Sequence, residues 1–123
     1  MKDCTIYKTM DIIGKRWTLC ILLELYKGDN NEKQFNELKG MIKGITPKML
    51  STRLKELEEQ GIIRKRVDST ALPARSFYSM TESGIDFIRI IQDIKKWALT
   101  WQFDNPKCKM SECKYCTNTV TSK

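Results

Sequence analysis

The sequence predicts a mainly helical α+β domain that carries one β-hairpin. Three observations predict it: apolar residues recur at helical spacing over most of the chain, a proline-started helix follows a glycine turn, and two strand-like segments precede a long apolar helix. The 123 residues suffice for one domain with a core and leave no room for a second of ordinary size. We therefore expect a folded domain over residues 1–103 and a cysteine-bearing tail over residues 104–123.

The first third of the chain predicts three helices. Apolar residues between residues 5 and 26 recur every three or four positions, and Gly14 interrupts them, so we expect two helices that meet there. Residues 27–32 are polar and rich in turn formers, which predicts a loop. Helical spacing resumes over residues 35–42, and Gly44 then allows a sharp turn.

The next helix has the clearest boundaries in the sequence. The Thr46 hydroxyl can accept a bond from a free backbone N–H, Pro47 needs no donor at the first helical position, and Gly61 can end the helix. Leucines occupy one face, at Leu50, Leu54 and Leu57. The opposite face carries hydroxyl and amino groups, at Thr46, Lys48, Ser51, Thr52 and Lys55.

A hairpin and a long helix follow. Residues 62–67 and 75–80 read as strands around a loop, and a helix begins near Thr81. The apolar residues of this helix cover more than one stripe and include Trp97 and Trp101. A monomer would leave one of its faces exposed, which suggests a dimer seam, although complete burial within one subunit is the alternative.

Composition favours an anionic partner. The chain has 22 Lys and Arg against 15 Asp and Glu, a formal charge of +7 and a pI of about 9.2, which leaves nucleic acid, an anionic membrane and an acidic protein as partners. It contains no His, so the commonest general acid–base residue is missing and we expect no enzyme activity. Because it has no long apolar run, we expect a cytoplasmic protein without a membrane partner.

The order of the predicted elements is that of a winged helix-turn-helix, which presents one helix to the major groove of double-stranded DNA. On this interpretation the polar face of the helix from Thr46 and the basic hairpin bind DNA. The alternatives are a solvated amphipathic helix and a charged edge strand, and Arg53 could instead brace the domain through an ion pair. The candidate DNA-binding residues are Thr46, Lys48, Ser51, Thr52, Arg53, Lys55, Arg64, Arg66 and Arg75.

Several motifs resemble the HxlR-type regulators, a branch of winged-helix proteins related to the MarR group. They lie between residues 4 and 101 and include Cys4, DIIGKRWTL from Asp11, FNEL from Phe35, GITPKMLSTRLKEL from Gly44, GII from Gly61 and YSMT from Tyr78. The resemblance implies a homodimer built from terminal helices that binds a pseudo-palindromic operator. It implies a transcription regulator, for which we favour repression, and a Cys4 that senses oxidants or electrophiles, with an inert thiol as the alternative.

The tail departs from that pattern. Cys108, Cys113 and Cys116 are spaced C-x4-C-x2-C, one ligand short of four, and Cys4 or a partner subunit could supply the fourth thiolate. An Fe–S cluster or Zn²⁺, a redox disulfide and an inert tail are the three alternatives. Cys20 lies within an apolar helix, so we expect a small core residue there.

Three other functions compete with a thiol-switched DNA-binding regulator. A regulator that senses a small molecule would use an apolar pocket near Trp17, Trp97 and Trp101 at the dimer interface. A protein–protein adaptor would bind its partner without the steep salt dependence of phosphate contacts. An electron-transfer protein would need a cluster at the tail cysteines.

Overall fold

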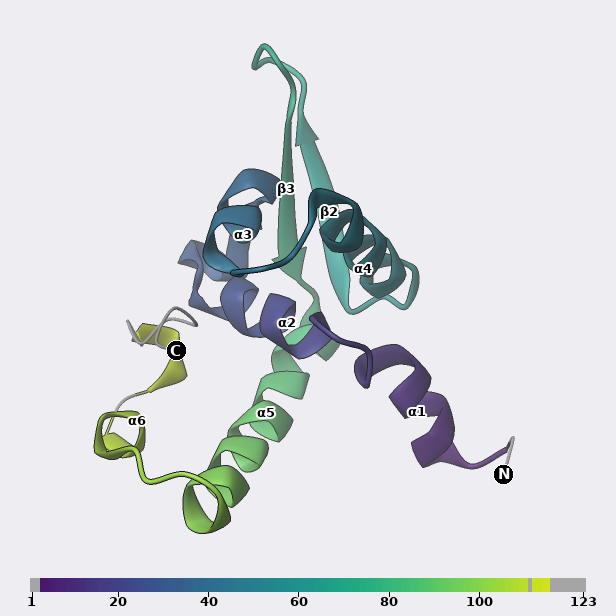
Figure 1. The fold of residues 1–123 in the computed structure, drawn as a ribbon. Helices are drawn as coiled ribbons and strands as arrows, with labels where there is room; N and C mark the ends of the chain where they lie inside the picture. The colour runs from purple at the N-terminus through teal and green to yellow at the C-terminus, as the bar shows by residue number, and fades with distance from the viewer. Residues whose placement is uncertain (1–2, 111, 116–123) are drawn as a thin grey trace.

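The computed structural model describes residues 3–110 and 112–115, and it confirms the mainly helical fold with a hairpin (Figure 1). The break at Gly14, the turn at Gly44 and the helix starts at Pro47 and Glu82 lie where the sequence predicts them. The elements in chain order are α1 (Thr5–Ile13), α2 (Thr18–Lys27), the 3-10 turn η1 (Asp29–Asn31), β1 (Glu32–Gln34), α3 (Phe35–Met41), α4 (Pro47–Glu59), β2 (Ile63–Asp68), β3 (Arg75–Met80), α5 (Glu82–Trp101), α6 (Pro106–Met110) and the 3-10 turn η2 (Cys113–Tyr115).

The sheet has three antiparallel strands in the order β1-β3-β2. The hairpin of β2 and β3 matches the prediction, but the sequence indicated only a loop where η1 and β1 form. Pairing of β1 with β3, from Glu32 opposite Ser79 to Gln34 opposite Phe77, holds this polar segment extended. The buried Glu24 carboxylate on α2 also fixes it, through an ion pair of 3.0 Å with Lys33.

One hydrophobic core unites α2, α3, α4, the sheet and the first half of α5. The leucine face of α4 is buried as predicted, with Leu50, Leu54 and Leu57 almost fully removed from water. They meet Ile21, Leu22 and Leu25 from α2 and Ile88 from α5 in the same cluster. The helix-turn-helix and the hairpin therefore rest on one packed base, and burial of these large side chains is their main stabilisation.

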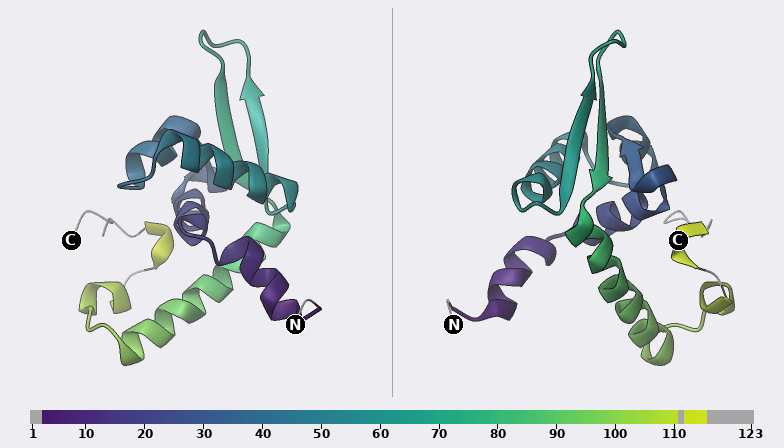
Figure 2. Two further views of the ribbon diagram at one scale, coloured as in Figure 1. Left: turned by 45° about the vertical axis from the view of Figure 1, so that its right-hand side comes forward. Right: turned by 180° about the vertical axis from the view of Figure 1, so that it is seen from behind.

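Two helical arms leave this core. Figures 1 and 2 show α1 projecting away from the rest of the chain on one side of α5, and α1 has no buried residue. In the first half of α5, one face covers the core with Ile88 and Ile91. The opposite face of α5 is open to water. The large apolar side chains exposed on the two arms and just after α5 are Ile6, Tyr7, Met10, Ile85, Ile90, Ile94, Trp97, Trp101 and Phe103.

Candidate nucleic-acid interface

The turn between α3 and α4 depends on Gly44. Its φ of +91° lies in the left-handed region that L side chains rarely adopt, and a Cβ there would lie 3.4 Å from the indole of Trp17. Trp17 itself packs against the core cluster just before α2. This arrangement fixes the direction in which α4 leaves α3, and it explains why a glycine stands at the turn of the helix-turn-helix.

α4 begins as the sequence predicts. The Thr46 Oγ1 accepts a hydrogen bond of 3.1 Å from the backbone N–H of Met49, and Pro47 occupies the first turn. The Thr46 hydroxyl is therefore engaged as a helix cap while its residue remains exposed. The cap sets the N-terminal end of α4 at the surface, next to the turn at Gly44.

The polar face of α4 is exposed along its first two and a half turns. Lys48, Ser51, Thr52 and Lys55 are all exposed, and the Thr52 hydroxyl donates to the backbone carbonyl of Lys48 at 2.9 Å. Two ammonium groups and two hydroxyls thus share one convex surface, which suits contacts with phosphates and base edges. The C-terminal end of α4 carries the opposite charge, at the exposed Glu58 and Glu59.

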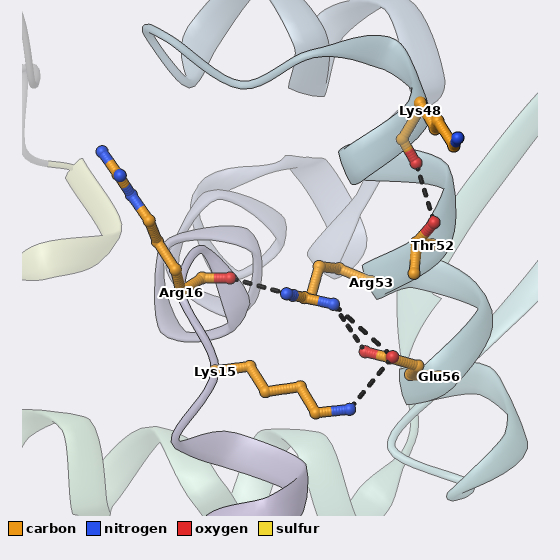
Figure 3. A network of polar contacts seen from close by, with 6 residues as sticks. All are labelled: Lys15, Arg16, Lys48, Thr52, Arg53 and Glu56. Carbon is orange, nitrogen blue, oxygen red and sulfur yellow. Dashed lines mark hydrogen bonds and ion pairs between the residues drawn. The ribbon is translucent and has the colours of Figure 1, made fainter.

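Arg53 takes the bracing position that the sequence left open as an alternative. Its Nε donates to the backbone carbonyl of Arg16 at 3.0 Å, and its Nη1 lies 3.2 Å from Glu56 Oε1. Lys15 reaches the same carboxylate at 3.1 Å, so the linker between α1 and α2 is tied to α4 twice (Figure 3). The Arg16 side chain points away from Arg53 in Figure 3 and stacks on the Trp17 ring at 4.5 Å.

The hairpin carries its basic side chains outward. Arg64, Lys65, Arg66 and Arg75 are exposed, and Arg66 also pairs with Glu32 of β1 at 3.1 Å while its guanidinium covers the Phe77 ring at 4.3 Å.

The carboxylate nearest the hairpin tip is engaged locally. Hydrogen bonds from the Thr70 hydroxyl and backbone N–H lower the pKa of Asp68, and the charges of Arg66 and Arg75 lower it further. Asp68, the only acidic residue of β2, therefore stays ionised, and its carboxylate accepts hydrogen bonds from Thr70 in the turn that follows. Two of the four exposed cations, Arg64 and Arg75, lie at opposite ends of the hairpin.

The three tryptophans do not gather within one protomer. Trp17 precedes α2 and lies under the Gly44 turn, whereas Trp97 and Trp101 lie exposed at the end of α5 that projects farthest from the core (Figure 1). An apolar sensing pocket bounded by all three would need a second chain.

The cysteines occupy separate places. Cys4, half-buried, directly precedes α1, and Cys108 and Cys113 are half-buried on α6 and η2. Figures 1 and 2 place α6 on the side of α5 away from α1, so Cys4 of the same chain does not join Cys108 or Cys113. Cys116 lies outside the described residues, and within them no three Cys, Asp or Glu side chains gather as metal ligands. The metal hypothesis thus gains no support from the described part of the chain.

The expectation that Cys20 is a core residue is wrong. The buried face of α2 is formed by Thr18, Ile21, Leu22 and Leu25, and Cys20 lies off that stripe at the surface. Neighbouring side chains nevertheless remove part of its water, which raises the pKa of the Cys20 thiol, and the Glu24 carboxylate raises it further. Cys20 is consequently a poor nucleophile at neutral pH.

Three charged residues matter to this architecture although sequence reasoning did not single them out. Glu56 joins Lys15 and Arg53, Glu32 joins the hairpin, and Lys114 returns from the tail to α2. Each contacts a partner between 34 and 88 residues away, and Glu56 also contacts Arg53 on the preceding turn of α4. Only the three-residue spacing of Arg53 and Glu56 gave a local signal.

Comparison with known proteins agrees with this geometry. The family model described as HxlR-like helix-turn-helix matches residues 12–105. YvaP of Bacillus subtilis strain 168, an uncharacterized HTH-type transcriptional regulator, is 35% identical over 94 residues, which cover 76% of this chain and 83% of YvaP.

Solved structures share the fold. The transcriptional regulator YodB of B. subtilis in its reduced form aligns with a TM-score of 0.70 and 31% identity, over 83% of this chain and 97% of YodB. The redox regulator HypR in its oxidized form aligns with a TM-score of 0.70 and 31% identity, over 81% and 99% of the two chains. The chain belongs to the HxlR-like helix-turn-helix family of transcriptional regulators.

Proposed function

We propose that this regulator binds double-stranded DNA with α4 in the major groove and the β2–β3 hairpin against the neighbouring backbone, and that it has no catalytic role. One observation carries the proposal: α4 buries its leucines and leaves Lys48, Ser51, Thr52 and Lys55 on an exposed face at the start of the helix. In a helix-turn-helix the N-terminal residues of the second helix contact base edges. Arg64, Arg66 and Arg75 supply cations for phosphates or for a narrow minor groove.

Salt-dependent binding tests this assignment. We would measure the affinity of the purified protein for the duplex upstream of its own gene and for a scrambled duplex, across salt concentrations. Lys48→Gln and Lys55→Gln should each weaken binding, and each should reduce the slope of log K against log salt by about 1 if the lysine contacts a phosphate. Lys107→Gln, an exposed lysine on α6, is the matched control. Equal binding by all variants, or no duplex binding at all, would contradict the proposal.

We also propose that the functional unit is a homodimer held by α1 and α5. α1 carries Ile6, Tyr7 and Met10 without burying any residue in its own chain, and α5 exposes Ile94, Trp97 and Trp101. Apolar patches of this kind on a small domain mark an interface, and a two-fold axis would make the same patch serve both copies. Such a dimer would bind a pseudo-palindrome whose half-sites lie about one helical turn apart.

Mass measurement in solution tests the dimer. Light scattering should give twice the mass of one 14.4 kDa chain. Ile94→Glu should shift the population toward monomers because it places a charge in the apolar seam. Asp93→Gln, on the neighbouring exposed position of α5, is the control that should leave the mass unchanged. A monomeric wild-type protein at the concentrations used for DNA binding would exclude this assembly.

Thiol chemistry at Cys4 is the proposed switch, and repression is the proposed output. Cys4 directly precedes α1, so an adduct or an intersubunit disulfide there would act on a helix of the proposed seam. HypR, which shares this fold, is a redox regulator. Repression is the simplest output, since a dimer across two major grooves excludes polymerase from that stretch of duplex.

Binding under reducing and oxidising conditions tests the switch. Treatment with diamide should lower the affinity of wild-type protein for its operator, and Cys4→Ser should remove that response. Cys20→Ser is the matched control, because the raised pKa of the Cys20 thiol makes it slow to react. A response that survives in Cys4→Ser would contradict the role of Cys4.

A further inference from the structure

The tail returns to the body of the protein at two printed contacts: Lys95 Nζ lies 3.8 Å from Cys113 Sγ, and the ammonium group of Lys114 reaches the end of α2. After α5 the chain turns at α6 and comes back to the C-terminal end of α2 (Figure 1). There Lys114 Nζ donates to the backbone carbonyl of Tyr26, to that of Gly28 at 2.9 Å and to Asn31 Oδ1 at 3.0 Å. The same ammonium lies 5.1 Å from the centre of the Tyr26 ring. We call this set of contacts the Lys114 strap.

The strap occupies a site where the backbone needs a cation. The last carbonyls of a helix lack partners within the helix, and the negative end of its dipole attracts positive charge. Tyr26 is in the last turn of α2, so Lys114 satisfies a carbonyl of that kind. A half-buried ammonium with three oxygen acceptors is a set of charge-assisted bonds, which are stronger than bonds between neutral groups.

The segment held by the strap contains two left-handed residues. Asn30 and Asn31 both have positive φ, 56° and 57°, in the left-handed region that favours glycine and that asparagine enters more readily than other L residues. The Asn31 side chain is held by Lys114, from which it accepts a hydrogen bond. Gly28 lies so close to the carbonyl of Glu32 that a Cβ there would collide with it. Movement of η1 would therefore displace the start of β1.

From β1 the contacts continue into the hairpin. Glu32 directly follows Asn31, pairs in register with Ser79 of β3 and forms the ion pair of 3.1 Å with Arg66 of β2. β1 also leads straight into α3, whose capping box begins at Gln34. One continuous series of contacts thus runs from Lys114 through Asn31 and Glu32 to Arg66.

We infer that the Lys114 strap is a regulatory device: closed, it holds η1 and β1 against the hairpin, and opened, it loosens the Glu32–Arg66 edge of the proposed DNA-binding surface. Coupling of this kind requires an element with two arrangements that both ends influence. Here that element is η1, whose Asn31 side chain is released when Lys114 leaves. The inference rests on the proposed function only in that the hairpin faces DNA.

Hydrogen exchange on the full-length protein without DNA tests the strap. Lys114→Gln removes the charge, and it should accelerate amide exchange roughly tenfold over residues 28–34 and 77–79. Lys107→Gln, from the same tail, should exchange as wild type. Asn31→Asp keeps an acceptor and adds a negative charge beside Lys114, so it should slow exchange over residues 28–34.

Three results would overturn the inference. Wild-type exchange rates in Lys114→Gln would show that the strap holds nothing, and acceleration that stops at residue 31 would show that it does not reach the hairpin. If amide exchange in α4, whose leucine face is buried, accelerates as much as exchange over residues 28–34, Lys114→Gln has lowered the stability of the whole domain. None of these measurements includes DNA, so failure of the strap and failure of DNA binding are distinguishable.

Discussion

The guanidinium of Arg53 binds the backbone carbonyl of Arg16, 37 positions earlier in the chain. α4, the second helix of the helix-turn-helix, is therefore positioned by its own side chain against the linker that joins α1 to α2. Arg53 also pairs with Glu56, and only 15% of its side chain is exposed. Its charge serves the placement of α4 within the protein.

We expect Arg53→Ala to lower the free energy of unfolding by about 2 kcal/mol, because it leaves the Arg16 carbonyl without its charged donor and the Glu56 carboxylate with Lys15 as its one remaining cation among these contacts. Lys48→Ala, on the exposed face of the same helix, should change stability by less than about 0.5 kcal/mol while it weakens DNA binding. Urea unfolding of the two variants, followed by DNA titration, separates the roles. Equal stability of both variants would contradict the bracing role.

A second prediction concerns the glycine turn. Gly44→Ala should destabilise the protein by about 1 kcal/mol or more, since alanine disfavours a φ of +91°. Gly40→Ala is the matched control, because Gly40 lies within α3 and a Cβ there meets nothing within 4 Å. That variant should be neutral or more stable by about 0.5–1 kcal/mol. Thermal unfolding of both variants beside wild type measures the direction of the stability change in each.

A third prediction separates two arginines of the hairpin. Arg75→Gln should weaken binding to all duplexes and reduce the salt slope by about 1, if Arg75 contacts a phosphate. Arg66→Gln should do the same and should also release Glu32, so its β1 amides should exchange faster without DNA. Salt titrations and hydrogen exchange on both variants measure the two effects. If the β1 amides of Arg66→Gln exchange at the wild-type rate, the ion pair between Arg66 and Glu32 does not stabilise β1.

A fourth prediction follows from the raised pKa of Cys20. The unfolded thiol ionises near its ordinary pKa of 9.0, whereas the folded thiol keeps its proton to higher pH. The contribution of this protonated thiol to stability is therefore present below pH 9 and is lost as the pH rises through the folded pKa. Cys20→Ser should remove that part of the alkaline loss. The urea midpoints of wild type and Cys20→Ser at pH 7 and pH 10 measure this loss. An equal fall of the midpoint in both proteins between pH 7 and pH 10 would contradict a raised pKa of Cys20.

Features encoded by local chemistry could be predicted from the sequence. Thr46 and Pro47 define a helix start by their own hydrogen-bonding capacity, and the spacing of Leu50, Leu54 and Leu57 defines its buried face. The same spacing rule, applied to α2, would have placed Cys20 outside the core. The buried stripe of this helix, which omits Cys20, is formed by Thr18, Ile21, Leu22 and Leu25. The wrong expectation came from the apolar character of the whole helix.

Features that depend on distant partners could not be predicted. β1 is an extended Glu-Lys-Gln segment that pairing with β3 and the buried Glu24 hold in place. The choice between DNA contact and bracing at Arg53 depends on the carbonyl of Arg16, and the tail attaches to η1 through Lys114. Each of these requires the folded chain before the side chain has anything to bind.

The distribution of charge along α4 would favour one orientation of the helix in the proposed complex with DNA. Its 13 residues span about 20 Å, and in a helix-turn-helix the N-terminal residues of the second helix are the ones that contact base edges. The lysine-bearing first turns and the positive end of the helix dipole are attracted to phosphates, whereas Glu58 and Glu59 are repelled. In the proposed complex a reversed approach would meet repulsion before any base is contacted, so wrong docking poses would be rejected at the encounter stage.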